Sequence, residues 1–281
     1  MNPPVTQRVF GMEADKGRWI FVIAGFLINI CIGSVYAYSV FRNPVQTLFQ
    51  TNTVESGLPF MVFLAFFAIL MFFGGKLMGK IGPRNISIIG GVLVGLGWIL
   101  SGILPQSLPS IWTLVLTYGV IAGSGVGLVY GAPIATSTQW FPDRKGLAVG
   151  LTVAGFGGSP FVTANIAGPL IQSHGPLYTF TVMGVGFLVI VIAFAFLLRF
   201  PAGGWQPACM ISGKAPAGFI SKLDLQPHEI VKTSTFWGLF FVYTIGSLAG
   251  LLAVGIASPV GTEIIQISAG TAATMVGIFA L

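Results

Sequence analysis

Apolar residues in this chain gather in runs of about twenty, and most charged side chains fall in the short segments between the runs. A run of this length carries a helix across a hydrocarbon layer roughly 30 Å thick. The pattern therefore predicts an all-α integral membrane protein with eight spans, numbered 1 to 8 in chain order: residues 19–41, 58–78, 86–104, 111–138, 147–171, 178–199, 235–257 and 265–281.

The distribution of charge indicates how these spans are oriented. Only 7% of the residues are Asp, Glu, Lys or Arg and the mean hydropathy is +0.90, whereas soluble domains are about one-quarter charged. Of the 13 Lys and Arg residues, all except Arg42 flank the same side of the predicted spans. The positive-inside rule places the N-terminus and the 200–234 segment in the cytoplasm, and we expect a multi-pass protein of the plasma membrane. Topology and contact with the lipid bilayer account for the net charge of +6, so no nucleic-acid partner is expected.

A weak internal repeat divides the chain. The stretch KGRWIFVIAGF opens span 1 and resembles STFWGLFFVYT, which opens span 7, and the two spans end at the tripeptides NPV and SPV. Parallel repeats of this kind relate the two halves of some membrane carriers. We expect an N-terminal six-helix bundle over 1–199, a cytoplasmic linker over 200–234, and the start of a second bundle over 235–281. Because Leu281 lies inside an apolar run, we also expect further C-terminal helices of the same carrier to be missing.

Small residues form regular stripes in spans 4 and 5. A spacing of four places them on one face of a helix, where close backbone approach lets membrane helices pack. The stripes indicate a tight helix interface, and such smooth surfaces also suit helices that rock between inward-open and outward-open states. Seven polar residues are expected to hydrogen-bond between helices rather than to contact substrate: Asn29, Thr152, Ser159, Thr163, Asn165, Thr244 and Ser247. The helix-packing residues are Gly119, Gly123, Gly127 and Gly131 in span 4, and Gly146, Gly150 and Gly158, with Ala154, in span 5.

Four short motifs carry a family resemblance. The stretch GGKLMGKIGPRN, between spans 2 and 3, resembles a loop motif of the major facilitator superfamily. The other three are GSVYAYSVFRNPV, GSGVGLVYG and WFPDRKGLAVG, and together the four make the chain similar to the oxalate/formate antiporter family and its monocarboxylate-carrying relatives. The loop motif is matched by Gly75, Lys80, Gly82 and Arg84, whereas Gly79 stands at its acidic position.

The resemblance implies a major facilitator fold, of which this chain holds the first six-helix half plus two helices of the second half. It also implies a secondary transporter that moves a small carboxylate by alternating access, with substrate in an aromatic cage. The cage would include Tyr36 and Tyr130, with cations from spans 8 and 11. Val35 stands where the oxalate carrier has a glutamine. A smaller or more apolar monocarboxylate therefore fits better than oxalate, whose two charges need many hydrogen-bond donors.

Two other residues receive expected roles. In the superfamily's loop motif the acidic residue helps to close the cytoplasmic side. We expect Asp143 to replace it, within ion-pair or water-bridged reach of Lys80 or Arg84 in an outward-facing state. Tyr38, near the outer end of span 1, is expected to anchor the helix at the membrane surface rather than to contact substrate.

Other classes of function have less support. The sequence has no H-E-x-x-H, G-x-S-x-G, Walker or C-x-x-C motif, so we do not expect an enzyme. His174 and His228 lack partners at ligand spacing, so no metal and no other cofactor is expected. Spans 1 to 7 hold no Asp, Glu or His well inside the membrane, which favours exchange or facilitated movement over proton symport. A carrier of a neutral small solute and a non-transporting membrane scaffold stay open as alternatives.

Overall fold

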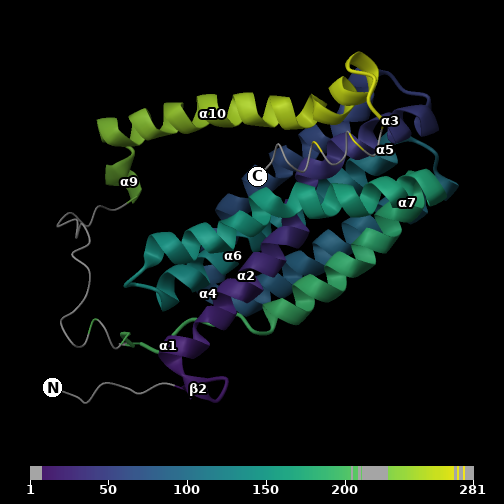
Figure 1. Cartoon of the computed structure of the whole chain (residues 1–281). Coiled ribbons are helices and arrows are strands. Elements are labelled where there is room, and N and C mark those ends of the chain that lie inside the picture. Colours follow the sequence, from purple (N-terminus) through teal and green to yellow (C-terminus); the bar gives the residue numbers. More distant parts are fainter. Residues whose placement is uncertain are drawn as a thin grey trace.

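The computed structural model describes residues 8–203, 205–207, 210, 227–268, 271 and 275. These residues form a bundle of long helices preceded by one small β-hairpin (Figure 1). The elements in chain order are β1 (Arg8–Val9), β2 (Met12–Glu13), α1 (Ala14–Gly17), α2 (Trp19–Ile32), the 3₁₀ helix η1 (Gly33–Ala37), α3 (Tyr38–Phe49), α4 (Thr53–Ser107), α5 (Ile111–Leu114), the π-helix η2 (Val115–Ala122), α6 (Gly123–Trp140), α7 (Lys145–Ala195), α9 (Pro227–Ile230), α10 (Ser234–Pro259) and the π-helix η3 (Val260–Ile264).

Two of the helices reverse direction at a Gly-Pro pair. Gly82 in α4 has φ 81° and ψ 167°, and Gly175 in α7 has φ 83° and ψ 170°. Glycine adopts this region readily because it has no Cβ. Pro83 and Pro176 follow, and proline suits the first turn of the next helix because its φ is already helical and its missing N–H is not needed there. The same pair of residues therefore ends one span and begins the next in both hairpins.

Packing against α6 confirms the reversal within α4. Gly74 and Gly90, on opposite sides of the kink, both lie against Leu128 of α6. In one straight helix these glycines would be about 24 Å apart along the axis. The chain must therefore turn back between them.

The reversals account for the predicted spans. The described residues contain five helices long and apolar enough to cross a membrane. Two of them, α4 and α7, are hairpins of two spans each, so spans 1 to 7 are all present, whereas most of predicted span 8 lies outside the described residues. The five helices cover Ala14–Phe49, Thr53–Ser107, Ile111–Trp140, Lys145–Ala195 and Ser234–Ala253.

Span 1 is longer than its apolar run predicts, because helical structure continues through Pro44 to Phe49. This extension changes the place of Tyr38. The tyrosine is only 3% exposed, its hydroxyl donates to the Ser56 carbonyl at 2.9 Å, and its ring stacks on Tyr118. The expectation that Tyr38 anchors the span at the membrane surface was therefore wrong.

The two stripes of small residues do not pack on each other. Three glycines of span 4 lie against the first half of α4; a Cβ on Gly123 or Gly127, for example, would meet a backbone carbonyl there. Gly150 is exposed, and Gly155 on a different face of α7 approaches the Phe26 carbonyl of span 1 instead. A Cβ on Gly131, Gly146 or Gly150 would have no described neighbour within 4 Å, and Ala154 is exposed and Gly158 half-buried.

Polar side chains join span 1 to span 5, as the sequence predicts for Asn29 and Ser159, whereas Asn165 and Thr244 donate to carbonyls of their own helices. The Asn29 side-chain amide donates to the Thr152 carbonyl at 3.0 Å, and the Ser159 hydroxyl donates to the Ile30 carbonyl at 2.5 Å. In a bilayer such bonds satisfy groups that lipid cannot. They fix the inner and middle parts of span 1 against α7.

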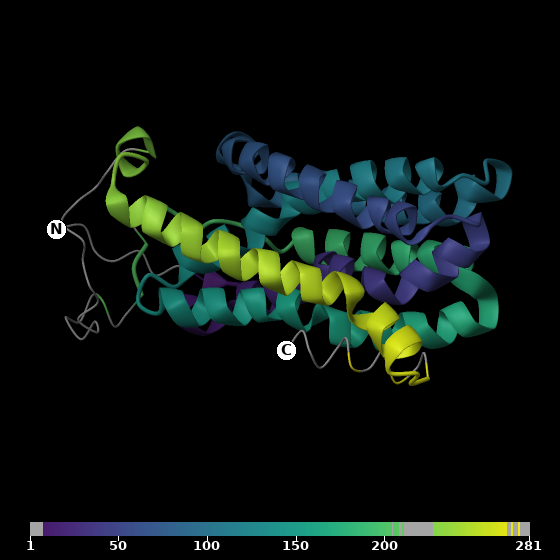
Figure 2. The ribbon, with the colours of Figure 1, turned by 90° about the horizontal axis from the view of Figure 1, so that it is seen from above.

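Helix α10 lies along one face of the bundle, as Figures 1 and 2 show together. Most of its side chains are exposed, and its contacts are concentrated at one end, where it meets α3. There the Asn43 amide donates to Thr262 and to the Glu263 carboxylate, at 3.3 and 3.0 Å. Span 7 is thus held to the first six spans mainly through the outer end of span 1.

Candidate functional site

Four aromatic rings from four spans meet inside the bundle. This aromatic cluster consists of Tyr36 (η1), Phe67 (α4), Tyr130 (α6) and Phe156 (α7). The ring centroids of Tyr36 and Tyr130 lie 5.3 and 4.9 Å from that of Phe156, both edge-on. Phe67 lies 5.5 Å from Tyr130 and 5.9 Å from Phe156. The two tyrosines that the family resemblance implies for the substrate cage therefore share one neighbour, Phe156.

Glycines explain why these rings can meet. A Cβ on Gly33 would strike the Phe156 carbonyl, and one on Gly127 would come within 2.6 Å of the Phe67 carbonyl. The absence of a side chain at both positions brings the backbones close enough for Tyr36 to reach Phe156 and for Phe67 to reach Tyr130. The 3₁₀ turn at Gly33–Ala37 occurs at the same point of span 1, and such turns within longer helices often mark functional sites.

The cluster offers a mainly aromatic surface with few donors. Tyr36 and Tyr130 are half-buried, and neither hydroxyl has a hydrogen-bond partner among the described residues. Aromatic ring edges carry partial positive charge, so edges and hydroxyls together favour a small anion with an apolar part. Phe67 and Phe156 lie in no motif of their own, so the sequence does not single them out.

The inner end of span 1 holds a buried ion pair. The Arg18 guanidinium binds both carboxylate oxygens of Asp143, at 2.5 and 3.0 Å, with side chains 8% and 1% exposed. Lys80 and Arg84 are exposed, and in the described residues no ion pair joins either of them to Asp143. In this structure Asp143 binds a cation that precedes span 1, not the loop between spans 2 and 3. Its expected reach to Lys80 or Arg84 in an outward-facing state stays a prediction.

Aromatic residues enclose this inner pair. The Arg18 guanidinium lies 4.3 Å from the centre of the Phe141 ring and donates to the Trp140 carbonyl at 3.2 Å. The Trp140 indole N–H in turn donates to the Arg199 carbonyl at 2.7 Å. The pair therefore ties together the inner ends of spans 1, 4, 5 and 6.

The loop motif between spans 2 and 3 has a clear structural role at one of its residues. Gly82 supplies the positive φ that reverses α4. Gly75, Lys80 and Arg84 are exposed, and a Cβ on Gly75 would have no described neighbour within 4 Å. Only Gly82 of the four motif residues is explained by the local fold.

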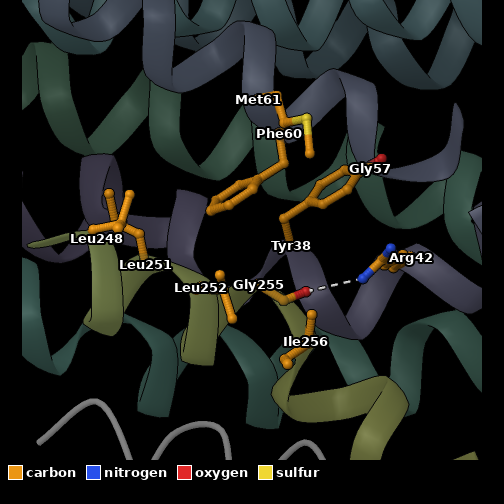
Figure 3. A pocket seen from close by; sticks show the side chains of 10 residues that line it. All are labelled: Tyr38, Arg42, Gly57, Phe60, Met61, Leu248, Leu251, Leu252, Gly255 and Ile256. Atoms are coloured by element: carbon orange, nitrogen blue, oxygen red, sulfur yellow. Dashed lines mark hydrogen bonds between the residues drawn. The ribbon is translucent and has the colours of Figure 1, made fainter. Parts of the chain in front are cut away.

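A pocket lies near the outer end of span 1, between α3, the first half of α4 and α10 (Figure 3). Its volume is about 380 Å³ and its lining is almost wholly apolar. The cation that the sequence places alone on the outer side, Arg42, lines it. The isolated position of Arg42 in the sequence is a sign that the residue has a special role. The sequence does not predict the pocket itself, because one of its walls comes from α10, about 200 residues later in the chain. The other lining residues are Tyr38, Gly57, Phe60, Met61, Leu248, Leu251, Leu252, Gly255 and Ile256.

Comparison with known proteins relates this architecture to a family. Residues 19–281 match the Major Facilitator Superfamily. The chain belongs to that superfamily. Solved structures agree: a crystal structure of the peptide transporter POT superposes with a TM-score of 0.53 over 93% of this chain and 52% of that one, at 17% identity. The all-α membrane architecture is therefore that of a major facilitator protein.

Curated relatives of this superfamily member are transporters, not enzymes. It is 30% identical to the oxalate:formate antiporter of Oxalobacter formigenes, over 94% of this chain and 60% of that protein. It is 25% identical to apicoplast pyruvate carrier 1 of Toxoplasma gondii, over 83% of this chain and 59% of that protein. Monocarboxylate transporter 9 of Rattus norvegicus is 30% identical over 59% of this chain and 32% of its own length. The chain thus spans about 60% of the length of the first two of these relatives.

Proposed function

We propose that this protein moves a small carboxylate across the membrane by alternating access and that the aromatic cluster contacts the substrate. The proposal rests on one observation: Tyr36 and Tyr130 both pack against the ring of Phe156. The relatives of the chain, which include an oxalate:formate antiporter and a pyruvate carrier, support it. Both hydroxyls are free to donate to a carboxylate. The rings around them accept the apolar remainder of the molecule.

The composition of the cluster favours a monocarboxylate over oxalate. Two phenylalanines supply no donor, and Val35, beside Tyr36, is buried and apolar. Each charge taken from water must be met by hydrogen bonds or a counter-ion. Two tyrosine hydroxyls can donate hydrogen bonds to one carboxylate but leave a second carboxylate without enough donors.

The wider organisation follows from the same proposal. Residues 1–199 form the first bundle, 200–234 the cytoplasmic linker and 235–281 the start of the second bundle, with the N-terminus in the cytoplasm of a plasma-membrane protein. Cations of the second half of the full-length carrier, in spans 8 and 11, supply the counter-charge. The substrate moves by exchange or facilitated movement rather than with a proton, because spans 1 to 7 hold no Asp, Glu or His well inside the membrane to carry one.

Counterflow with the full-length protein tests this function. Proteoliposomes loaded with unlabelled formate or pyruvate should take up the labelled acid, and uptake should persist when the pH gradient is collapsed. Tyr36→Phe or Tyr130→Phe should each reduce the initial rate roughly tenfold, since a hydrogen bond to a charged group contributes about 1.5–3 kcal/mol. Tyr178→Phe is the matched control, because Tyr178 is 47% exposed and stacks on His174 far along α7 from the cluster.

Each failure points to a different alternative. Uptake of a neutral solute with no carboxylate exchange would replace the carboxylate by a neutral substrate. Absence of transport for every solute tried, in protein that is folded and inserted, would favour a non-transporting scaffold. Equal rates in Tyr36→Phe, Tyr130→Phe and Tyr178→Phe would remove the aromatic cluster from the substrate path.

A further inference from the structure

Arg42 is a cation without a carboxylate partner in the part of the chain that the structure describes. Its Nη2 donates to the Thr53 carbonyl at 2.8 Å, and its Nη1 lies 3.4 Å from the Gly255 carbonyl. Its Nε is buried and has no hydrogen-bond partner. In the described part of the chain no acid lies within ion-pair distance of it, and the carboxylate of Glu263 accepts from Asn43 instead.

The weaker of these contacts has a local cause. Gly255 lies four residues before Pro259, which has no N–H to donate to the Gly255 carbonyl in α10. Arg42 therefore approaches an acceptor that lacks its usual helical donor four residues on, at a distance beyond that of a usual N–H···O bond. Carbonyl dipoles reduce the cost of this charge but do not neutralise it.

The space beside this cation suits a small molecule with one charged end. Figure 3 shows Arg42 at one end of the pocket, next to Ile256 and Gly255, with Phe60 and Leu252 along the wall. Pockets for small ligands range from about 300 to 1,000 Å³, so about 380 Å³ holds only a small one. The remaining polar side chain, Tyr38, already donates its hydroxyl to the protein.

The pocket is separate from the aromatic cluster. Phe60 of the pocket and Phe67 of the cluster are both in α4, about two helical turns or 10 Å apart along the axis. Tyr36 and Arg42 are separated by a similar distance along span 1. The pocket lies toward the outer end, so a substrate could occupy it without touching Tyr36 or Tyr130.

We propose that Arg42 and this pocket form an outer binding site for a short-chain alkyl monocarboxylate. The carboxylate binds the Arg42 guanidinium in place of the Gly255 carbonyl, and the alkyl chain lies against Phe60, Met61 and Leu252. The charge on Arg42 excludes alkyl cations, and the apolar wall disfavours a second carboxylate because nothing there would pair with it. This site depends on the proposed function only for the class of its ligand. The monocarboxylate that binds at Arg42 would be the substrate that passes inward to the aromatic cluster.

Photolabelling locates the site independently of transport. The probe is a short-chain alkyl carboxylate that carries a diazirine, added to the full-length protein in lipid nanodiscs, with labelled peptides identified by mass spectrometry. We expect label in residues 57–61 and 248–256, and competition by butyrate but not by butyramide, its neutral counterpart. Arg42→Gln should reduce labelling there roughly tenfold, and Arg42→Lys should retain part of it.

Two further variants separate binding from folding. Leu252→Trp fills the pocket from a side chain that is 63% exposed, so it should abolish the label without unfolding the helix. Arg8→Gln removes an exposed cation of β1 and should leave the label unchanged. Equal labelling in wild type and Arg42→Gln, or equal competition by butyrate and butyramide, would overturn the site and indicate binding of an apolar chain alone.

The outcome also separates this site from the proposed function. Arg42-dependent label in a protein that exchanges no carboxylate would support the outer site and refute the function. Carboxylate exchange that depends on Tyr36, with label that maps only to residues around Tyr36 and Tyr130, would support the function and refute the outer site.

Discussion

The two arginines at the ends of span 1 lie in different electrostatic surroundings. Arg18, at the inner end, is 7% exposed and meets a nearly fully buried carboxylate through two short hydrogen bonds. Arg42, at the outer end, is half-buried and meets only backbone carbonyls. One helix therefore carries one neutralised charge and one charge that is still available for an anion.

The surroundings differ in the same sense. At the inner end the chain packs aromatic rings around the pair, and four spans share it. At the outer end span 1 contacts α10, whose side chains are mostly exposed, across a pocket. A buried charge that is paired with a carboxylate holds its helix in place. A charge that has no carboxylate partner in the described residues and lies beside an apolar pocket favours the binding of an anion. We infer that span 1 is fixed at its inner end and adaptable at its outer end.

The largest effect is expected from breaking the inner pair. Asp143→Ala removes two hydrogen bonds of the buried Arg18 guanidinium and leaves it only the partly exposed Asp15 carboxylate, 3.5 Å away. Removal of one member of a buried pair costs about 3–5 kcal/mol. The free energy of unfolding, measured in mixed micelles of detergent and SDS, should fall by that amount.

The inner pair offers its own controls. Arg144 lies 3.9 Å from Asp143 with a side chain that is 62% exposed, so Arg144→Ala should change stability very little. The double variant Arg18→Met with Asp143→Leu should be more stable than Asp143→Ala alone, because both buried charges are gone and the Asp15 carboxylate that loses Arg18 is 39% exposed. A double variant as unstable as the single one would mean that packing, and not charge, sets the cost.

A medium effect is expected in the middle of span 1. Gly155→Val would push a side chain into the Phe26 carbonyl and against Asn29, and overpacking of this kind costs about 1–3 kcal/mol. Gly150→Val, on an exposed face of the same helix with no described neighbour within 4 Å, is the matched control. Equal unfolding free energies for the two variants would show that span 1 is not fixed against α7.

The sequence predicts the spans better than it predicts their partners. Seven spans follow from the lengths of the apolar runs, because each span must be apolar over most of its length whatever it packs against. The reversal at Gly82 and Pro83 is also visible in the sequence, as part of the loop motif, because a turn of this kind needs particular residues whatever the rest of the chain packs against. Span 1 was predicted too short, since Arg42 and Pro44 end the apolar run but not the helix.

The contacts between spans needed the structure. The proximity of Tyr36 and Tyr130 was expected only from the family resemblance, and two of the 24 phenylalanines complete their cluster without any local signal. The pairing of Arg18 with Asp143 joins residues 125 positions apart. Such pairings depend on which helix faces meet, and spacing along the chain does not determine that.

The smallest effect is expected at the outer end. Arg42→Met removes a long hydrogen bond to the Gly255 carbonyl and a normal one to the Thr53 carbonyl. It also removes a guanidinium whose Nε has no acceptor among the described residues. The lost bonds and the relieved charge oppose each other, so the free energy of unfolding should change by at most about 1 kcal/mol. The same measurement on Asp143→Ala supplies the scale. A loss in Arg42→Met as large as that in Asp143→Ala would mean that Arg42 is a structural residue like Arg18, and the contrast between the two ends of span 1 would disappear.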